Sequence, residues 1–245
     1  MRRFYADELD VFAPQIGPAA LEILSLPTCA PLCALISQVD RLPAEVIPPA
    51  LALLRAVAAA SGGIAQLQQH AAAALPTLAQ IVIRDSAQNE LRASAMHTLA
   101  AIVHDASAED AAACAALLEP LAAALAAALA PLAALPFADV KHAAYHLLES
   151  LAGRPWGLAA MVAAAGLLDQ LLDGEAAARE DREDSQWRYS VLRAVLACEG
   201  AQEVVGDRTQ YVAQLVERGD AQGSGGGGRQ PNPAPQVMVE QRGAQ

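Results

Sequence analysis

Apolar and polar residues follow one another along most of this chain with the period of an α-helix. Between residues 91 and 102, for example, Leu91, Ala95, Leu99 and Ile102 recur three or four positions apart, which places them on one helical face. No segment of the sequence shows the sustained alternation that a half-buried strand requires. The pattern therefore predicts an all-α protein.

Proline and glycine divide this pattern into short segments. Proline is tolerated in the first turn of a helix and breaks a helix elsewhere. No long structureless loop is needed before about residue 220, which favours a compact array of short helices. The prolines at or near segment starts are Pro18, Pro31, Pro49, Pro76, Pro120, Pro136 and Pro155, and the glycines near segment ends or turns are Gly62, Gly153, Gly166, Gly200 and Gly219.

The segments resemble one another at a nearly constant spacing. Leu99 and its neighbours align with Leu148 and its neighbours 49 positions later, with Leu192 a further 44 positions on, and with Leu54 45 positions earlier. Repeats of roughly 40 to 47 residues are typical of HEAT and armadillo arrays, in which each unit buries its apolar face against the next. The spacing predicts an armadillo/HEAT-like helical solenoid. The alternative is a non-repetitive helical bundle, which also places apolar residues at these helical intervals.

The length of the repeat suggests that each one contains three helices. One unit can be followed between Gly62 and Val103. We expect a short first helix over 63–69, a second from about 73 to 83 and a long third helix over 87–103.

The longest apolar run, residues 111–135, is long enough to span a bilayer. Glu119 lies within it, Pro120 and Pro131 interrupt it, and its many alanines contribute little to membrane insertion. We therefore expect two soluble helices here and no membrane association.

Composition divides the chain into two parts. The repeats are expected to occupy residues 1–220. From residue 221 the chain is rich in Gly, Pro, Asn and Gln, which cannot bury a core. Residues 221–245 are therefore expected to form a disordered tail.

The chain is strongly acidic, with a formal net charge of −11 and a sequence pI near 4.8. Lys141 is its one lysine, and the overall field would repel nucleic acid and anionic lipids. The acidic run 175–184 is most simply a solvated loop or the start of a helix. The four cysteines include no Cys-x-x-Cys pair, which indicates a reducing compartment.

Signs of catalytic chemistry are weak. His142 and His146 have the i, i+4 spacing of a zinc-binding helix, but residue 143 is alanine and no third ligand follows at a suitable spacing. No Gly-rich phosphate loop or nucleophile elbow is present. We expect no metal, no cofactor, no small-molecule substrate and no enzymatic activity.

The repeat register predicts a polar face on the third helices. If Leu91, Ala95, Leu99 and Ile102 face the core, then Ala93, His97, Ala100 and His104 face away from it. This face of the third helix lines the concave surface of armadillo arrays, so its polar residues are candidates for binding a protein partner, although ordinary solvated side chains explain them equally well. The candidates in the successive repeats are His97, His142, His146, Glu149, Gln186, Ser190 and Arg193.

The two tryptophans are expected to differ. Trp156 follows Pro155 and should pack between repeats, since a large aromatic in an Ala-rich array is usually core. The position of Trp187 is left open. It lacks the nearby asparagine of importin-like grooves, which disfavours nuclear-import cargo as a partner.

Local motifs add a family resemblance over residues 135–218. The motifs occur in a set order: Leu135-Pro136-Phe137, then Leu151-Ala152-Gly153-Arg154-Pro155-Trp156-Gly157, then Leu171-Leu172-Asp173-Gly174, then Tyr189-Ser190-Val191-Leu192-Arg193-Ala194. This part resembles the C-terminal part of the 26S proteasome non-ATPase regulatory subunit 5 family, while residues 1–134 match only as repeats.

The resemblance also implies a function. It implies an armadillo/HEAT-like chaperone that binds an ATPase subunit of the proteasome regulatory-particle base during assembly, located in the cytoplasm with the nucleus as a further compartment. Family members extend further on the N-terminal side, so N-terminal repeats are expected to be missing here. The alternative is a general armadillo/HEAT scaffold or adaptor with another protein client.

Overall fold

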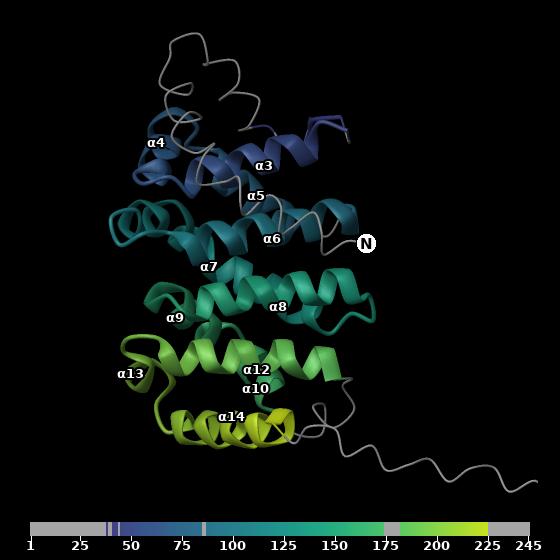
Figure 1. Ribbon diagram of the computed structural model, residues 1–245, viewed down its shortest axis with the longest axis vertical. Coiled ribbons are helices and arrows are strands. Elements are labelled where there is room, and N and C mark those ends of the chain that lie inside the picture. Colours follow the sequence, from purple (N-terminus) through teal and green to yellow (C-terminus); the bar gives the residue numbers. More distant parts are fainter. Residues whose placement is uncertain (1–37, 39–40, 44, 85–86, 174–181, 225–245) are drawn as a thin grey trace, which may run out of the picture.

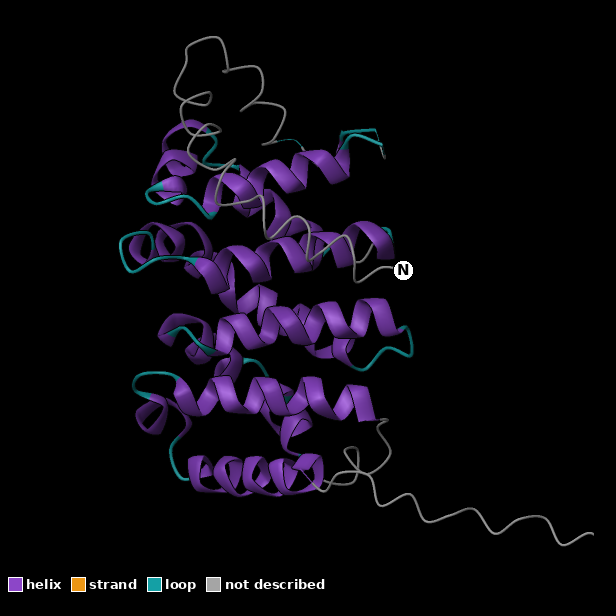
Figure 2. Ribbon diagram, viewed as in Figure 1, coloured by secondary structure: helices purple, strands orange, loops and turns teal. Residues whose placement is uncertain are grey.

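The computed structural model describes residues 38, 41–43, 45–84, 87–173 and 182–224. Within these ranges the regular elements are helices and no strand is present (Figure 2). The helices are α3 (Ile47–Ala58), α4 (Gly63–His70), α5 (Ala74–Ile83), α6 (Asn89–Asp105), α7 (Ala111–Ala133), α8 (Ala138–Ala152), α9 (Pro155–Ala163), α10 (Leu167–Leu172), α12 (Arg182–Ala197), α13 (Ala201–Val205) and α14 (Arg208–Ser224).

The long helices of successive repeats stack side by side. α3, α6, α8 and α12 lie in order down the long axis of the molecule, and α5, α7 and α10 lie behind them (Figure 1). The short helices α4, α9 and α13 lie along one side, on the left in Figure 1. The bounds of α4, α5 and α6 follow the three-helix unit expected between Gly62 and Val103 to within two residues at every end. The all-α solenoid is therefore confirmed.

A ladder of leucines forms the core between the stacked helices. Leu54, Leu99, Leu148 and Leu192 occupy equivalent positions on α3, α6, α8 and α12, and each is 0% exposed. A fully buried leucine contributes roughly 1.5–3 kcal/mol relative to an exposed one. The alignment of the repeats predicted from the sequence spacing is therefore the one found in the core.

α7 differs from the expectation of two helices, because it runs unbroken through Pro120 and Pro131. A proline inside a helix frees the carbonyl four residues earlier, here on Ala116 and Ala127. Both alanines and both prolines are exposed, so water can satisfy these carbonyls. Leu118, Leu125 and Leu129 form one buried stripe along the same helix, and their burial offsets the cost of the prolines.

α7 is also the one helix in the described part of the chain that is long and apolar enough to cross a membrane, by length and composition. In the array it packs against α5, α8 and α9. The absence of membrane association stays a prediction.

Charged side chains join one repeat to the next at helix ends. The Arg154 guanidinium donates hydrogen bonds to the carbonyls of Val103, His104 and Ala106 at the C-terminal end of α6, at 2.6 to 3.2 Å. The buried Asp110 carboxylate accepts from the backbone N–H groups of Gly62 and Ala65 at the start of α4, at 3.1 and 3.4 Å. These groups have no partner within their own helices, so Arg154 and Asp110 each cap a helix that comes earlier in the chain.

The last described helix extends past residue 220, where the repeats were expected to stop. α14 continues to Ser224. The rest of the expected tail, 225–245, and the repeats expected in residues 1–37 lie outside the described residues.

Candidate partner-binding surface

The candidate residues lie on the face formed by α6, α8 and α12, which we call the third-helix face. His97, Gln186 and Arg193 are exposed, and His142, His146, Glu149 and Ser190 are partly buried. Two alanines were wrongly assigned to this face, since Ala93 and Ala100 are buried. Neighbouring helices approach closely enough to cover small side chains there, while the longer histidines extend beyond them.

An inter-repeat cluster of rings crosses this face. The Nδ1 atoms of His97 on α6 and His146 on α8 are 3.3 Å apart, and these residues are 49 positions apart in the sequence. The ring of Trp187 on α12 lies 5.9 Å, between centroids, from both His142 and His146. The cluster thus ties the predicted candidates His97, His142 and His146 to Trp187, whose position the sequence left open.

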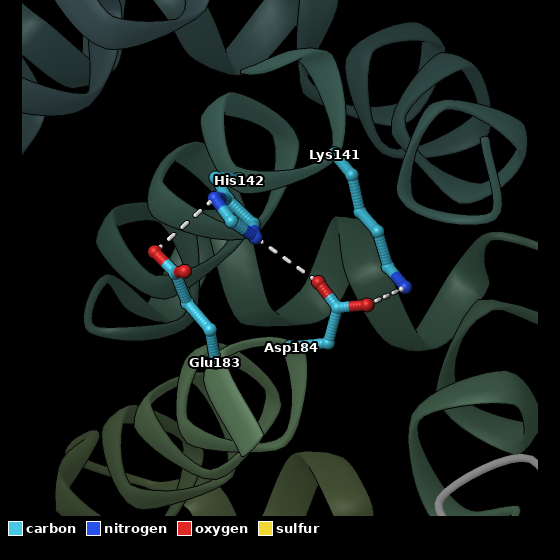
Figure 3. Close-up of polar contacts among 4 residues, drawn as sticks. All are labelled: Lys141, His142, Glu183 and Asp184. Atoms are coloured by element: carbon cyan, nitrogen blue, oxygen red, sulfur yellow. Dashed lines mark hydrogen bonds and ion pairs between the residues drawn. The ribbon is translucent and has the colours of Figure 1, made fainter. Parts of the chain in front are cut away.

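A polar junction fastens α8 to the first turn of α12 beside this cluster (Figure 3). The Asp184 carboxylate accepts a hydrogen bond from Lys141 Nζ at 2.6 Å and lies 3.0 Å from His142 Nε2. Glu183 lies on the other side of the His142 ring, with 3.7 Å between Oε1 and Nδ1. Burial raises the pKa of Asp184, but the hydrogen bonds from Lys141 and His142 outweigh it and lower the pKa overall. This end of the acidic run 175–184 is therefore the start of a helix, which was one of the two expectations for it, and Asp184 packs against α8 there.

Two histidines of the ring cluster, His97 and His146, have pKa values below the usual range, which favours their neutral form at physiological pH. Burial, together with the nearby His97 and His104, lowers the pKa of His146 to about 4. Although His97 is exposed as a residue, the protein atoms around its ring desolvate it and lower its pKa, and Arg55 contributes in the same direction. Burial raises the pKa of Glu149. Low-dielectric surroundings disfavour the charged form in each case.

We expect acidification to destabilise the protein through His146. Its pKa is 6.5 in the unfolded reference and about 4 when folded. The unfolded chain therefore binds more protons between these values, and stability is lost as the pH falls through this window. Between pH 7 and pH 5 the free energy of unfolding should fall by about 2 kcal/mol. His146→Gln should remove this part of the pH dependence, measured by urea denaturation at both pH values.

His70→Gln provides the control for this prediction, because His70 is an exposed histidine on α4. Because its pKa is raised, Glu149 makes the folded protein more stable as the pH falls, over part of the same pH range. This contribution cancels from the comparison, since Glu149 is present in all the proteins compared. If His146→Gln keeps the full pH dependence, the cluster does not hold His146 neutral.

The arrangement does not assemble a metal site from the described residues, in which no group of three or more His, Cys, Asp or Glu side chains converges as ligands. His142 is instead engaged by Trp187 and Asp184. The other tryptophan, Trp156, packs against the core as expected.

A groove of about 900 Å³ opens next to the ring cluster. It lies across the N-terminal ends of α6 and α8 and reaches α12. The sequence reading missed most of its lining. Phe137 stands in one of the family motifs and directly before a helix start, but nothing in the sequence indicates that it is exposed. The lining residues are Asn89, Glu90, Ala93, Ser94, His97, Phe137, Asp139, Val140, His142 and Trp187.

Comparison with known proteins supports both the fold and a family. A family described as proteasome non-ATPase 26S subunit matches residues 32–217. Among solved structures, a designed armadillo repeat protein, YIII(Dq)4CqI, superposes with a TM-score of 0.57 at 18% identity, covering 86% of this chain and 90% of that one. At this identity the likeness concerns the fold alone. The search of curated proteins found no match.

Proposed function

The chain belongs to the proteasome non-ATPase 26S subunit family, and from this membership we propose that it is an assembly chaperone of the regulatory-particle base. Within the family, the motifs between residues 135 and 195 favour subunit 5. In this role the protein binds an ATPase subunit in the cytoplasm and catalyses no reaction. Its contribution is a preformed surface that covers part of the subunit until assembly proceeds.

The observation that carries the proposal is the continuity of the third-helix face across repeats. The ring cluster and the polar junction connect α6, α8 and α12 through side chains, so the face is held as one rigid surface. A preorganised surface loses less conformational entropy when a partner binds. Armadillo-type arrays present extended surfaces of this kind to proteins.

Exchanging the charges of Glu149 and Arg193 tests this surface. The two residues interact electrostatically across α8 and α12, so the exchange Glu149→Arg with Arg193→Glu keeps opposite charges next to each other and leaves the net charge unchanged. A partner that binds through these two charges would face a negative charge in place of the positive one and the reverse. Charges at the rim of an interface mainly affect the rate of association. We expect retention of regulatory-particle ATPases in an affinity pull-down to fall at least fivefold, with unchanged helicity.

A second charge exchange, at a site away from the third-helix face, controls for the effect of exchanging an acidic and a basic residue. Arg208 and Asp169 form an exposed ion pair, with 2.8 Å between Nη1 and Oδ1, between α14 and α10. Exchanging this pair should leave the pull-down unchanged. The wild-type protein should retain ATPases of the regulatory particle without the 20S core. Recovery of unrelated clients alone would instead support a general armadillo adaptor.

A further inference from the structure

The groove combines an apolar floor with an exposed aromatic edge. Val140 and Ala93 are buried beneath it, whereas Phe137 is 57% exposed. Trp187 contributes one more aromatic ring from α12. Phe137 and Tyr211 are the exposed large hydrophobic residues of the described chain, and Phe137 borders this groove. Partly exposed aromatics beside a concavity are typical anchors for a partner.

The edges of the groove are acidic. Glu90 lies in the first turn of α6 and Asp139 in the first turn of α8. Each helix start contributes only about half a positive charge, which a full carboxylate outweighs. Glu183 and Asp184 on α12 add two further carboxylates nearby against the single ammonium of Lys141. His97 adds no positive charge at neutral pH, because its pKa is lowered.

We propose that this groove binds a short basic and apolar segment of the protein partner, in which an arginine or lysine lies next to a large aliphatic or aromatic side chain. The apolar side chain packs between Phe137 and Trp187, and the cation lies against Glu90 and Asp139. A groove of this volume accommodates about three or four residues of an extended chain and not a folded domain. The inference rests on the proposed function only for the identity of the partner. The chemistry of the bound segment follows from the groove itself.

Trp187 can report directly on an occupied groove. The chain has two tryptophans, so Trp156→Phe leaves Trp187 as the single indole. Three eight-residue peptides serve as probes: one with two leucines between two arginines, one with glutamates in place of the arginines, and one with serines in place of the leucines. We expect only the first peptide to shift the Trp187 emission in a saturable way, and more weakly at high salt.

Two variants locate the binding. In the Trp156→Phe background, Phe137→Ala should weaken binding of the first peptide at least tenfold, because it removes the apolar anchor. Glu90→Lys should weaken it to a similar degree by reversing an edge charge. Tyr211→Ala, at a 42% exposed aromatic on α14, and Glu203→Lys, on α13, are the matched controls and should bind as the background does.

The outcomes separate this inference from the proposed function. If Phe137→Ala and Glu90→Lys both bind the first peptide as tightly as the Trp156→Phe background does, the groove assignment is overturned, even if ATPases are retained from the cell. Equal binding of all three peptides by the background would overturn it as well. Retention of no ATPase together with selective peptide binding would remove the proposed function and leave the groove assignment intact. Self-association that Phe137→Ala abolishes, measured by sedimentation, would assign the groove to a second copy and also overturn the inference.

Discussion

Gly157→Ala is expected to lower the free energy of unfolding by about 3 kcal/mol, the upper part of the range for overpacking a buried site. A Cβ at this position would lie 2.3 Å from the Leu151 carbonyl oxygen and 2.9 Å from its carbon. These are backbone atoms of α8, which cannot rotate away as a flexible side chain can. Gly157 is buried in the first turns of α9, so α9 would have to move off the end of α8.

Gly153→Ala is the matched control, four residues earlier in the same connection. The nearest atom to a Cβ there, the Ser150 carbonyl oxygen, is 3.7 Å away, an ordinary contact. Gly153 also has a φ of −72°, which alanine adopts without strain. Urea denaturation followed by circular dichroism should therefore separate the two variants. Equal stability of both would mean that α9 does not approach α8 as closely as described.

Leu148→Ala is expected to cost about 3–4 kcal/mol through the cavity that it leaves. Leu148 is 0% exposed, and α8 packs against both α6 and α12, so neither neighbouring helix can collapse into the space without losing contacts on its other side. Each repeat is stabilised mainly by its neighbours, and a cavity in a central repeat therefore weakens two interfaces.

Leu148→Met provides the control, because it nearly preserves the volume and should cost less than about 1.5 kcal/mol. Chemical denaturation of the three proteins checks the order. A loss below about 1 kcal/mol for Leu148→Ala would show that the array relaxes around the site more easily than a close-packed core allows.

Both predictions involve α8, which also carries the candidate binding residues His142, His146 and Glu149. α8 presents Leu148 to the core and His146 and Glu149 to the third-helix face. Stability and binding can therefore be altered separately on one helix. Variants of Glu149 that change the pull-down at constant helicity act on the surface, while variants of Leu148 act on the array.

The sequence predicted the third helices best. Leu54, Leu99, Leu148 and Leu192 could be aligned because an α-helix turns each side chain by a constant angle, so spacing alone assigns a residue to a face. The same rule placed His97 and His146 on one face. It failed for Ala93 and Ala100 because burial of a small side chain depends on how closely the next helix approaches, which spacing does not report.

The prediction that residues 111–135 form two helices was wrong for a related reason. Proline has a local cost in a helix, and the sequence shows that cost at Pro120 and Pro131. It does not show that both prolines and the carbonyls that they free face water, nor that the leucines on either side of Pro120 share one buried stripe. Whether the helix continues depends on the balance between the free-energy cost of each proline and the stabilisation from burying the leucines. Only the burial depends on neighbouring helices.

By itself, then, the sequence determined the helical class, the repeat and the faces of the long helices, because each follows from local periodicity. The tertiary structure decided the contacts between segments about 48 residues apart, those of Arg154 with the end of α6 and of Asp110 with the start of α4. It also decided the close approach of α9 to α8 at Gly157. It also decided the groove that Glu90, Phe137 and Trp187 line together. These features depend on the tilt and distance between helices, which arise from the packing of many side chains at once and leave no periodic trace in the chain.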